Sequence, residues 1–136
     1  MKFFLDNNLP PNWAACLSAA SNNQFAGAQV ECVTHLKDSY ARNTPDVVWI
    51  EDLARQKDWV VISGDAFRKS NSAERKVLRS RGLSVFVMQS SWSSHPYWEK
   101  SAQLLLWWPR IVAQAHSAEC VAMEVPWRSA SRFRQM

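Results

Sequence analysis

The most regular feature of the sequence is a series of short, continuous apolar runs separated by polar or helix-forming residues. The clearest run is Trp-Val-Val-Ile at residues 59–62, and comparable runs lie at residues 3–5 and 85–88, with two more, each interrupted by one glutamate, at residues 30–33 and 120–125. Continuous apolar runs, unlike alternating ones, are typical of strands that are buried on both faces of a parallel sheet. Each run therefore predicts one strand of such a sheet.

Helical signals fill the intervals between these strands. Apolar residues recur at helical spacing over residues 12–21, and Thr-Pro-Asp at residues 44–46 has the hydroxyl, proline and acid of a helix start. A basic helix is predicted over residues 72–80, and a long helix begins at residues 94–96. Pro109 is expected to kink or end that long helix, because proline has no backbone N–H to donate.

Alternating strands and helices predict an α/β fold, a three-layer sandwich with a mostly parallel five-stranded sheet. The chain has 136 residues, of which 47% are hydrophobic, so residues 1–136 are expected to form a single domain. The longest apolar runs, such as residues 104–108, are too short to span a bilayer. Asp6 follows the first apolar run too early for a signal peptide, so we expect a cytoplasmic protein without membrane association.

Three aspartates are predicted at one edge of this sheet. Asp6 ends the first strand, Asp65 ends the third, and Asp46 begins the helix that follows the second. Loops that follow parallel strands all lie at the same edge, where open α/β sheets bind their ligands. Three nearby carboxylates repel one another unless a cation neutralises them, and oxygen ligands suit Mg²⁺ or Mn²⁺. Each acid also has a simpler interpretation: Asp6 and Asp65 as turn residues, Asp46 as a partner of the helix dipole.

Positive charge is concentrated directly after Asp65. The chain has a formal net charge of +4. Four basic residues of this segment are candidates for contacts with nucleic-acid phosphates: Arg68, Lys69, Arg75 and Lys76. The alternative is a solvated helix face. Among the acids, Glu51 lies four residues before Arg55, which indicates an ion pair on the surface.

Seven of the eight tryptophans divide by their surroundings. Four lie in apolar segments and are predicted to belong to the core: Trp49, Trp59, Trp107 and Trp108. Three lie among polar residues and are predicted either to stack on bases or to anchor a protein partner: Trp92, Trp98 and Trp127. We favour the interpretation that these three tryptophans anchor a protein partner. That partner includes the possibility of a second copy of the chain, in a homodimer.

Three motifs, taken in order, resemble those of a known family. They are Phe-Leu-Asp-Asn-Asn-Leu-Pro at residues 4–10, Pro-Asp-Val-Val-Trp-Ile at residues 45–50, and Val-Ile-Ser-Gly-Asp at residues 61–65. Together they resemble the PIN-like domains, metal-dependent ribonucleases that include the VapC-type toxins of toxin–antitoxin pairs. The resemblance covers about residues 2–90 and is best with the short PIN-like branch.

This resemblance implies a function and a set of site residues. Asp6, Asp46 and Asp65 would form the acidic metal site, with Asn8 and Ser63 as supporting polar groups. The activity implied is a Mg²⁺-dependent endoribonuclease with an RNA substrate and a cognate antitoxin as its protein partner.

Two other functions compete with this hypothesis. Short PIN-like members often carry an acid where this chain has Asn7, and another where it has Ala66. A catalytically depleted PIN-like fold that binds RNA or protein is therefore the alternative. A phosphoacceptor receiver domain would need an acidic pair after the first strand and a lysine after the fifth, where this chain has Pro-Trp-Arg at residues 126–128.

Overall fold

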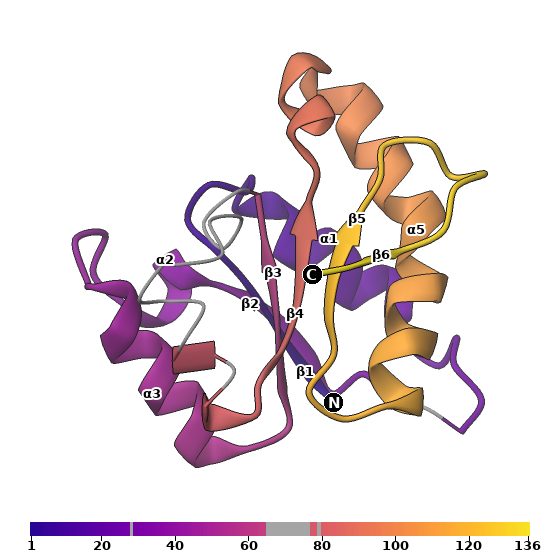
Figure 1. The fold of residues 1–136 in the computed structure, drawn as a ribbon. Helices are drawn as coiled ribbons and strands as arrows, with labels where there is room; N and C mark the ends of the chain where they lie inside the picture. The colour runs from indigo at the N-terminus through magenta and orange to yellow at the C-terminus, as the bar shows by residue number, and fades with distance from the viewer. Residues whose placement is uncertain (28, 65–76, 79) are drawn as a thin grey trace.

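The computed structural model of the chain describes residues 1–27, 29–64, 77, 78 and 80–136. A six-stranded sheet lies between two layers of helices (Figure 1). Its strands, in chain order, are β1 (Lys2–Leu5), β2 (Cys32–His35), β3 (Trp59–Ser63), β4 (Ser84–Met88), β5 (Ala122–Val125) and β6 (Arg134–Gln135). The described helices are α1 (Asn12–Ser21), α2 (Leu36–Ser39), α3 (Asp46–Gln56), the short 3₁₀ helix η1 (Ser90–Ser94) and α5 (Tyr97–Ser117).

The sheet order is β2-β1-β3-β4-β5-β6, and every neighbouring pair is parallel except β5 and β6. The α/β sandwich with a mostly parallel sheet is therefore confirmed. The sixth strand, the antiparallel β6, was not predicted, because it is two exposed residues long and has no apolar run. The structure also places β2 two residues later than the apolar run at 30–33 indicated.

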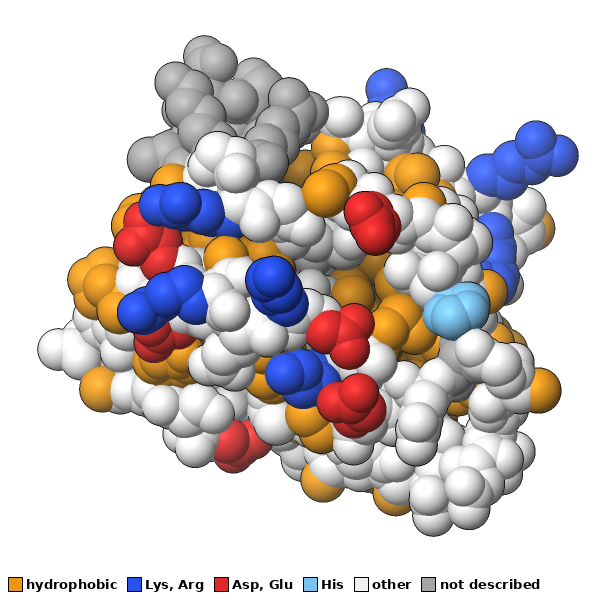
Figure 2. Space-filling model, turned by 90° about the horizontal axis from the view of Figure 1, so that it is seen from below, with side chains coloured by type: hydrophobic (Ala, Val, Ile, Leu, Met, Phe, Trp, Pro, Cys, Tyr) orange, Lys and Arg blue, Asp and Glu red, His pale blue; other side chains and the backbone are white. Residues whose placement is uncertain are grey.

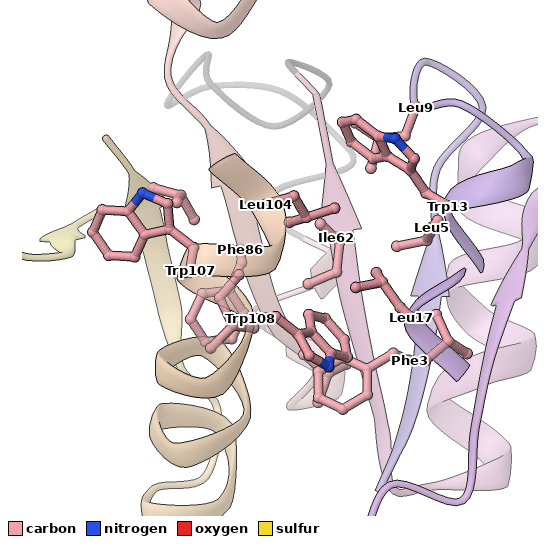
Figure 3. Packing of buried hydrophobic residues seen from close by; sticks show 14 of the residues in the cluster. Phe3, Leu5, Leu9, Trp13, Leu17, Ile62, Phe86, Leu104, Trp107 and Trp108 are labelled. Atoms are coloured by element: carbon pink, nitrogen blue, oxygen red, sulfur yellow. The ribbon is translucent and has the colours of Figure 1, made fainter. Parts of the chain in front are cut away.

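Successive residues of the strands face opposite layers, as expected for strands that are buried on both faces. Phe3 and Leu5 belong to one hydrophobic cluster with residues of α1 and α5, and Phe4 belongs to a second cluster with residues of α2 and α3. Figure 3 shows the first cluster, in which Trp108 lies against Phe3. Strand β1 can occupy a central position in the sheet because it has apolar side chains to bury on both faces.

Helix α5 continues through Pro109 to Ser117, so of the two expected effects of this proline, a kink or a helix end, the helix end does not occur. The chain then returns as β5 and β6, and the segment between them packs against α5. The Arg110 guanidinium donates hydrogen bonds to the carbonyls of Ser129 and Ser131 at 2.6 and 2.7 Å and lies 3.8 Å from the centre of the Trp107 ring. No helix among the described residues is both long and apolar enough to cross a membrane.

The order of the strands reverses between β1 and β3. From β1 the chain passes through α1 to β2 on one side, and from β2 it crosses to β3 on the other side. At such a switch point the two adjacent connections leave in opposite directions, which opens a crevice at the carboxyl ends of the strands. The residues that follow β1 and end β3 are therefore the first place to search for a site.

Candidate functional site

Asp6 lies at the switch point, directly after β1. Its side chain is only 4% exposed, and a buried carboxylate needs hydrogen-bond donors. Its Oδ1 accepts a hydrogen bond from the Asn7 backbone N–H at 2.6 Å, and its Oδ2 accepts one from the buried Ser63 hydroxyl at 3.0 Å. The Asp6 N–H donates to the Ile62 carbonyl at 2.9 Å, so the ends of β1 and β3 fix this carboxylate in place. The predicted proximity of Asp6 and Ser63 is thus present in the structure.

Asn8 joins the same two loops one step further out. Its Oδ1 accepts a hydrogen bond from the Gly64 N–H at 2.9 Å. A Cβ atom at Gly64 would lie 2.9 Å from Asn8 Cγ, closer than real Cβ contacts come. The absence of a side chain at Gly64 therefore lets the loop after β1 pack directly on the end of β3.

His35 supports this loop from the other side, and sequence spacing offers no signal for it. It is the last residue of β2 and is fully buried. Its Nδ1 accepts a hydrogen bond from the Lys37 N–H at 3.1 Å, so Nε2 carries the proton that is donated to the Leu9 carbonyl at 2.8 Å. Through this bond His35 holds the segment that contains Asn7 and Asn8.

Asp46 is the first residue of α3, the helix that precedes β3. Its Oδ1 accepts a hydrogen bond from the indole N–H of Trp49 at 3.1 Å. The Trp49 ring is fully buried and stacks on Phe4 of β1, with 4.9 Å between the ring centroids. The start of α3 is therefore fixed against the strand that precedes Asp6.

The third predicted acid, Asp65, lies outside the described residues, and so do the four predicted phosphate-binding residues Arg68, Lys69, Arg75 and Lys76. Within the described part of the chain, no three His, Cys, Asp or Glu side chains lie close enough together to hold a metal ion. The complete three-acid site therefore stays a prediction.

Two neighbouring acids have other partners. Glu51 pairs with Arg81 at 3.2 Å, and Arg55 pairs with Asp52, so the predicted Glu51–Arg55 pair is wrong. Asp52 also accepts a hydrogen bond from the Tyr40 hydroxyl at 3.1 Å. Burial raises the pKa of Tyr40 above its ordinary value, and this hydrogen bond to Asp52 raises the pKa further.

A pocket of about 160 Å³ adjoins the Asn8–Gly64 contact. Its walls include Trp13 and Trp92, and Lys100 of α5 lies at its border. Trp92 is buried and donates its indole N–H to the Val125 carbonyl at 2.9 Å, which corrects the prediction that it is a surface residue. The short helix η1 folds Trp92 inward although its sequence neighbours are serines.

The opposite edge of the sheet has a different electrostatic character. Figure 2 views the molecule from that side and shows acidic and basic side chains interspersed. The N-terminal ammonium there lies 3.3 Å from Asp58 and 3.8 Å from Glu31. Charges of both signs in such proximity weaken one another's field at a distance.

Comparison with known proteins bears on the region that has just been described. The model of the PIN-like domain matches residues 1–90, about two thirds of the chain. The chain belongs to the PIN-like domain family. No curated protein and no solved structure matches the chain significantly. The matched residues of this PIN-like domain run from β1 to the end of β4 and include Asp6, Asn8, Asp46 and Ser63. Membership of this family supports a nuclease-type role.

Proposed function

We propose that this PIN-like domain is a metal-dependent endoribonuclease, the toxin of a toxin–antitoxin pair. It hydrolyses RNA phosphodiester bonds at the carboxyl edge of the sheet. The observation that carries the proposal is the buried Asp6 carboxylate, fixed by the Ser63 hydroxyl at the switch point between β1 and β3.

The donor atoms at this edge suit a hard divalent cation. Asp6 and Asp46 supply carboxylate oxygens, Ser63 a hydroxyl and Asn8 an amide oxygen, a set that favours Mg²⁺ or Mn²⁺ over zinc. Asp6, Asp46 and Asp65 would hold the ion. When bound, such an ion lowers the pKa of a coordinated water and neutralises charge on the phosphate.

The chain's own residues would orient and assist the reaction. The hydrogen bonds from Asn7 and Ser63 hold the Asp6 carboxylate in one rotamer, so no reorganisation is needed when substrate binds. A carboxylate held in this way is placed to accept the proton of an attacking water. The basic segment at residues 68–76 would contact the phosphates that flank the scissile bond. The antitoxin partner follows from the likeness to VapC-type toxins.

The test compares wild type with Asp6→Asn on a labelled single-stranded RNA, in Mg²⁺ and in EDTA. We expect cleavage by wild type in Mg²⁺ alone and a loss of at least about 100-fold in Asp6→Asn. Asp58→Asn is the matched control, because it removes the same charge from the opposite edge, and it should cleave like wild type. Circular dichroism and urea unfolding establish that each variant is folded.

A second variant separates catalysis from folding. Ser63→Ala keeps the Asp6 charge and removes only its orienting hydroxyl, so activity should fall by roughly 10-fold to 100-fold. Cleavage that survives in both Asp6→Asn and Ser63→Ala, or that persists in EDTA, would contradict the proposed site.

A binding module without catalysis is the second candidate. It is favoured by one feature of the sequence: Asn7 stands where short PIN-like members often carry an acid. In that case wild type would bind the same RNA without cutting it in Mg²⁺, and Asp6→Asn would bind it equally well.

A further inference from the structure

The pocket of about 160 Å³ beside the Asn8–Gly64 contact lies where the loop after β1 meets α1, β4, η1 and α5. We call it the indole pocket, because Trp13 of α1 and Trp92 of η1 form part of its wall. Gly64, which also lines the pocket, directly follows Ser63, the residue whose hydroxyl donates to Asp6. The indole pocket therefore adjoins the edge that is proposed for catalysis.

Both indole N–H groups of this pocket donate to acceptors outside its wall. The Trp13 N–H donates to the Ser101 hydroxyl at 2.8 Å, and the Trp92 N–H donates to the Val125 carbonyl at 2.9 Å. The Trp127 ring packs edge-on against Trp92, with 4.9 Å between the ring centroids. The two indoles are thus fixed before a ligand arrives, and they offer it ring carbon rather than a hydrogen-bond donor.

Lys100 gives the indole pocket its charge. No other charged side chain is found among the described residues of the wall, whose apolar part also includes Met88 and Leu9, beside Trp13 (Figure 3). Lys100 is half-buried, and no acid in the described part of the chain forms an ion pair with it. An anionic group beside this ammonium is favourable, and no acid in the described wall repels it.

The size of the indole pocket limits what can enter it. Pockets that enclose a whole drug-sized ligand have volumes of about 300–1,000 Å³, so 160 Å³ holds one ring system of a larger molecule. A nucleotide unit of RNA has both required parts, an aromatic base for the indoles and a phosphate for Lys100. An apolar side chain of a protein partner would fill the pocket but would leave the lysine unused. A base within a duplex is stacked and paired, so it cannot enter.

We propose that the indole pocket binds one unpaired base of an RNA substrate and that Lys100 contacts an adjoining phosphate. This inference rests on the proposed ribonuclease function and adds how that enzyme selects its substrate. The base lies at a fixed number of nucleotides from the scissile bond, because the pocket and Asp6 are joined through the same two loops. The indole donors are already engaged, so the two indoles recognise the presence of a base and not its hydrogen-bonding edge.

The first test plugs the pocket and measures binding without cleavage. Fluorescence anisotropy of a labelled single-stranded RNA in EDTA gives the dissociation constant. Ser93 is exposed and lines the pocket, so Ser93→Trp should place a ring at its mouth and raise the dissociation constant at least about 5-fold. Ser94→Trp is the matched control and should bind like wild type, because Ser94 is exposed in the same short helix but does not line the pocket. The two serine hydroxyls donate equivalent hydrogen bonds, at 2.7 and 2.9 Å, so both variants lose the same contact.

A charge variant tests Lys100 in the same assay. Lys100→Gln should weaken binding and make it less dependent on salt, because one phosphate contact is lost. Lys57→Gln removes the same charge from an exposed position just after α3, outside the pocket, and should leave both properties unchanged.

An abasic scan tests the fixed distance. One abasic residue is placed at successive positions of the RNA, and wild type is allowed to cut it in Mg²⁺. Cleavage at the bond that lies one fixed distance from the abasic residue should fall at least about 5-fold, while other bonds are cut as before. The lengths of the products identify that distance.

The outcomes separate this inference from the proposed function. Cleavage in Mg²⁺ that is insensitive to Ser93→Trp and to every abasic position would overturn the base pocket and leave the nuclease standing. RNA binding that Ser93→Trp weakens and Ser94→Trp does not, without cleavage by wild type, would support the pocket and overturn the nuclease. Equal RNA binding by wild type and Ser93→Trp would overturn the pocket as a base site and favour a protein side chain as its occupant.

Discussion

Residues 1–90 and residues 91–136 have different tasks in this domain. The first region matches the PIN-like model and holds polar side chains at the carboxyl edge through short hydrogen bonds, as between Ser63 and Asp6. The second region lies beyond the match and consists mainly of α5 and the strands that follow it. It contributes packing: Trp107, Trp108 and Ile111 are buried in the cluster that also contains Phe3.

The point in the chain where the match to the family model ends is not a boundary between two folding units. Phe3 of β1 and Trp108 of α5 have ring centroids 4.7 Å apart, and Trp13 of α1 donates a hydrogen bond to Ser101 of α5. One hydrophobic cluster therefore spans both regions. We expect the chemistry to depend on the first region and the stability on both.

The largest effect should come from the second region. Trp108→Ala removes a buried ring and its hydrogen bond to Ser21, so the free energy of unfolding should fall by about 3–5 kcal/mol. Trp98→Ala removes the same side chain from an exposed position of the same helix and should change it by less than about 0.5 kcal/mol. Urea unfolding of both variants measures this difference. Equal, small effects would mean that α5 is an appendage to the first region.

An intermediate effect should come from His35. His35→Ala leaves the Leu9 carbonyl and the Lys37 N–H without their buried partner, which should cost about 1–3 kcal/mol of unfolding free energy. His35→Asn keeps an acceptor beside Lys37 and should cost less. If His35 positions the loop after Asp6, His35→Ala removes the support of that loop. This substitution should therefore lower kcat for RNA cleavage more than it raises KM. His116→Ala, at an exposed histidine, is the control, and unchanged kcat in folded His35→Ala would contradict this role.

The smallest effect concerns Gly64 and Asn8. Gly64→Ala sets a Cβ 2.9 Å from Asn8 Cγ and should destabilise the chain by about 1 kcal/mol. Asn8→Ala removes the side chain that is in the way, so the double variant should be no less stable than Asn8→Ala alone. A double-mutant cycle by urea unfolding measures the coupling, and strictly additive effects would show that the two residues are not in contact.

The parallel core of the sheet was predictable from sequence, whereas its edges were not. Strands β1, β3 and β4 are buried on both faces, so their apolar runs match their bounds to within one residue. Strand β2 lies at the edge of the sheet and has a half-buried pattern, and β6 has no apolar residue. The helix does not end at Pro109, because buried contacts on both sides of the proline maintain α5.

The candidate site, like the sheet, was predictable from the sequence only in part. Asp6 follows from the rule that parallel strands end at one edge, whereas Ser63 was implied only by the resemblance to PIN-like domains, and the structure joins the two by a hydrogen bond. The role of His35 could not be predicted from the sequence, because its hydrogen-bond partner is the Leu9 backbone carbonyl. Every residue has a backbone carbonyl, so the spacing of residue types does not reveal such a contact. The burial of Trp92 was missed for a similar reason, since its partner is the Val125 carbonyl, 33 residues away.

The most direct test of the proposed site is anomalous diffraction from crystals soaked in Mn²⁺. We predict an anomalous peak at the switch point, at a coordination distance of about 2.1 Å from a carboxylate oxygen of Asp6. Asp46 and Asp65 should lie around the same ion. Crystals of Asp6→Asn should lose the peak. A wild-type crystal with no peak beside Asp6, or with Mn²⁺ bound only at some other part of the molecule, would contradict the proposed metal site.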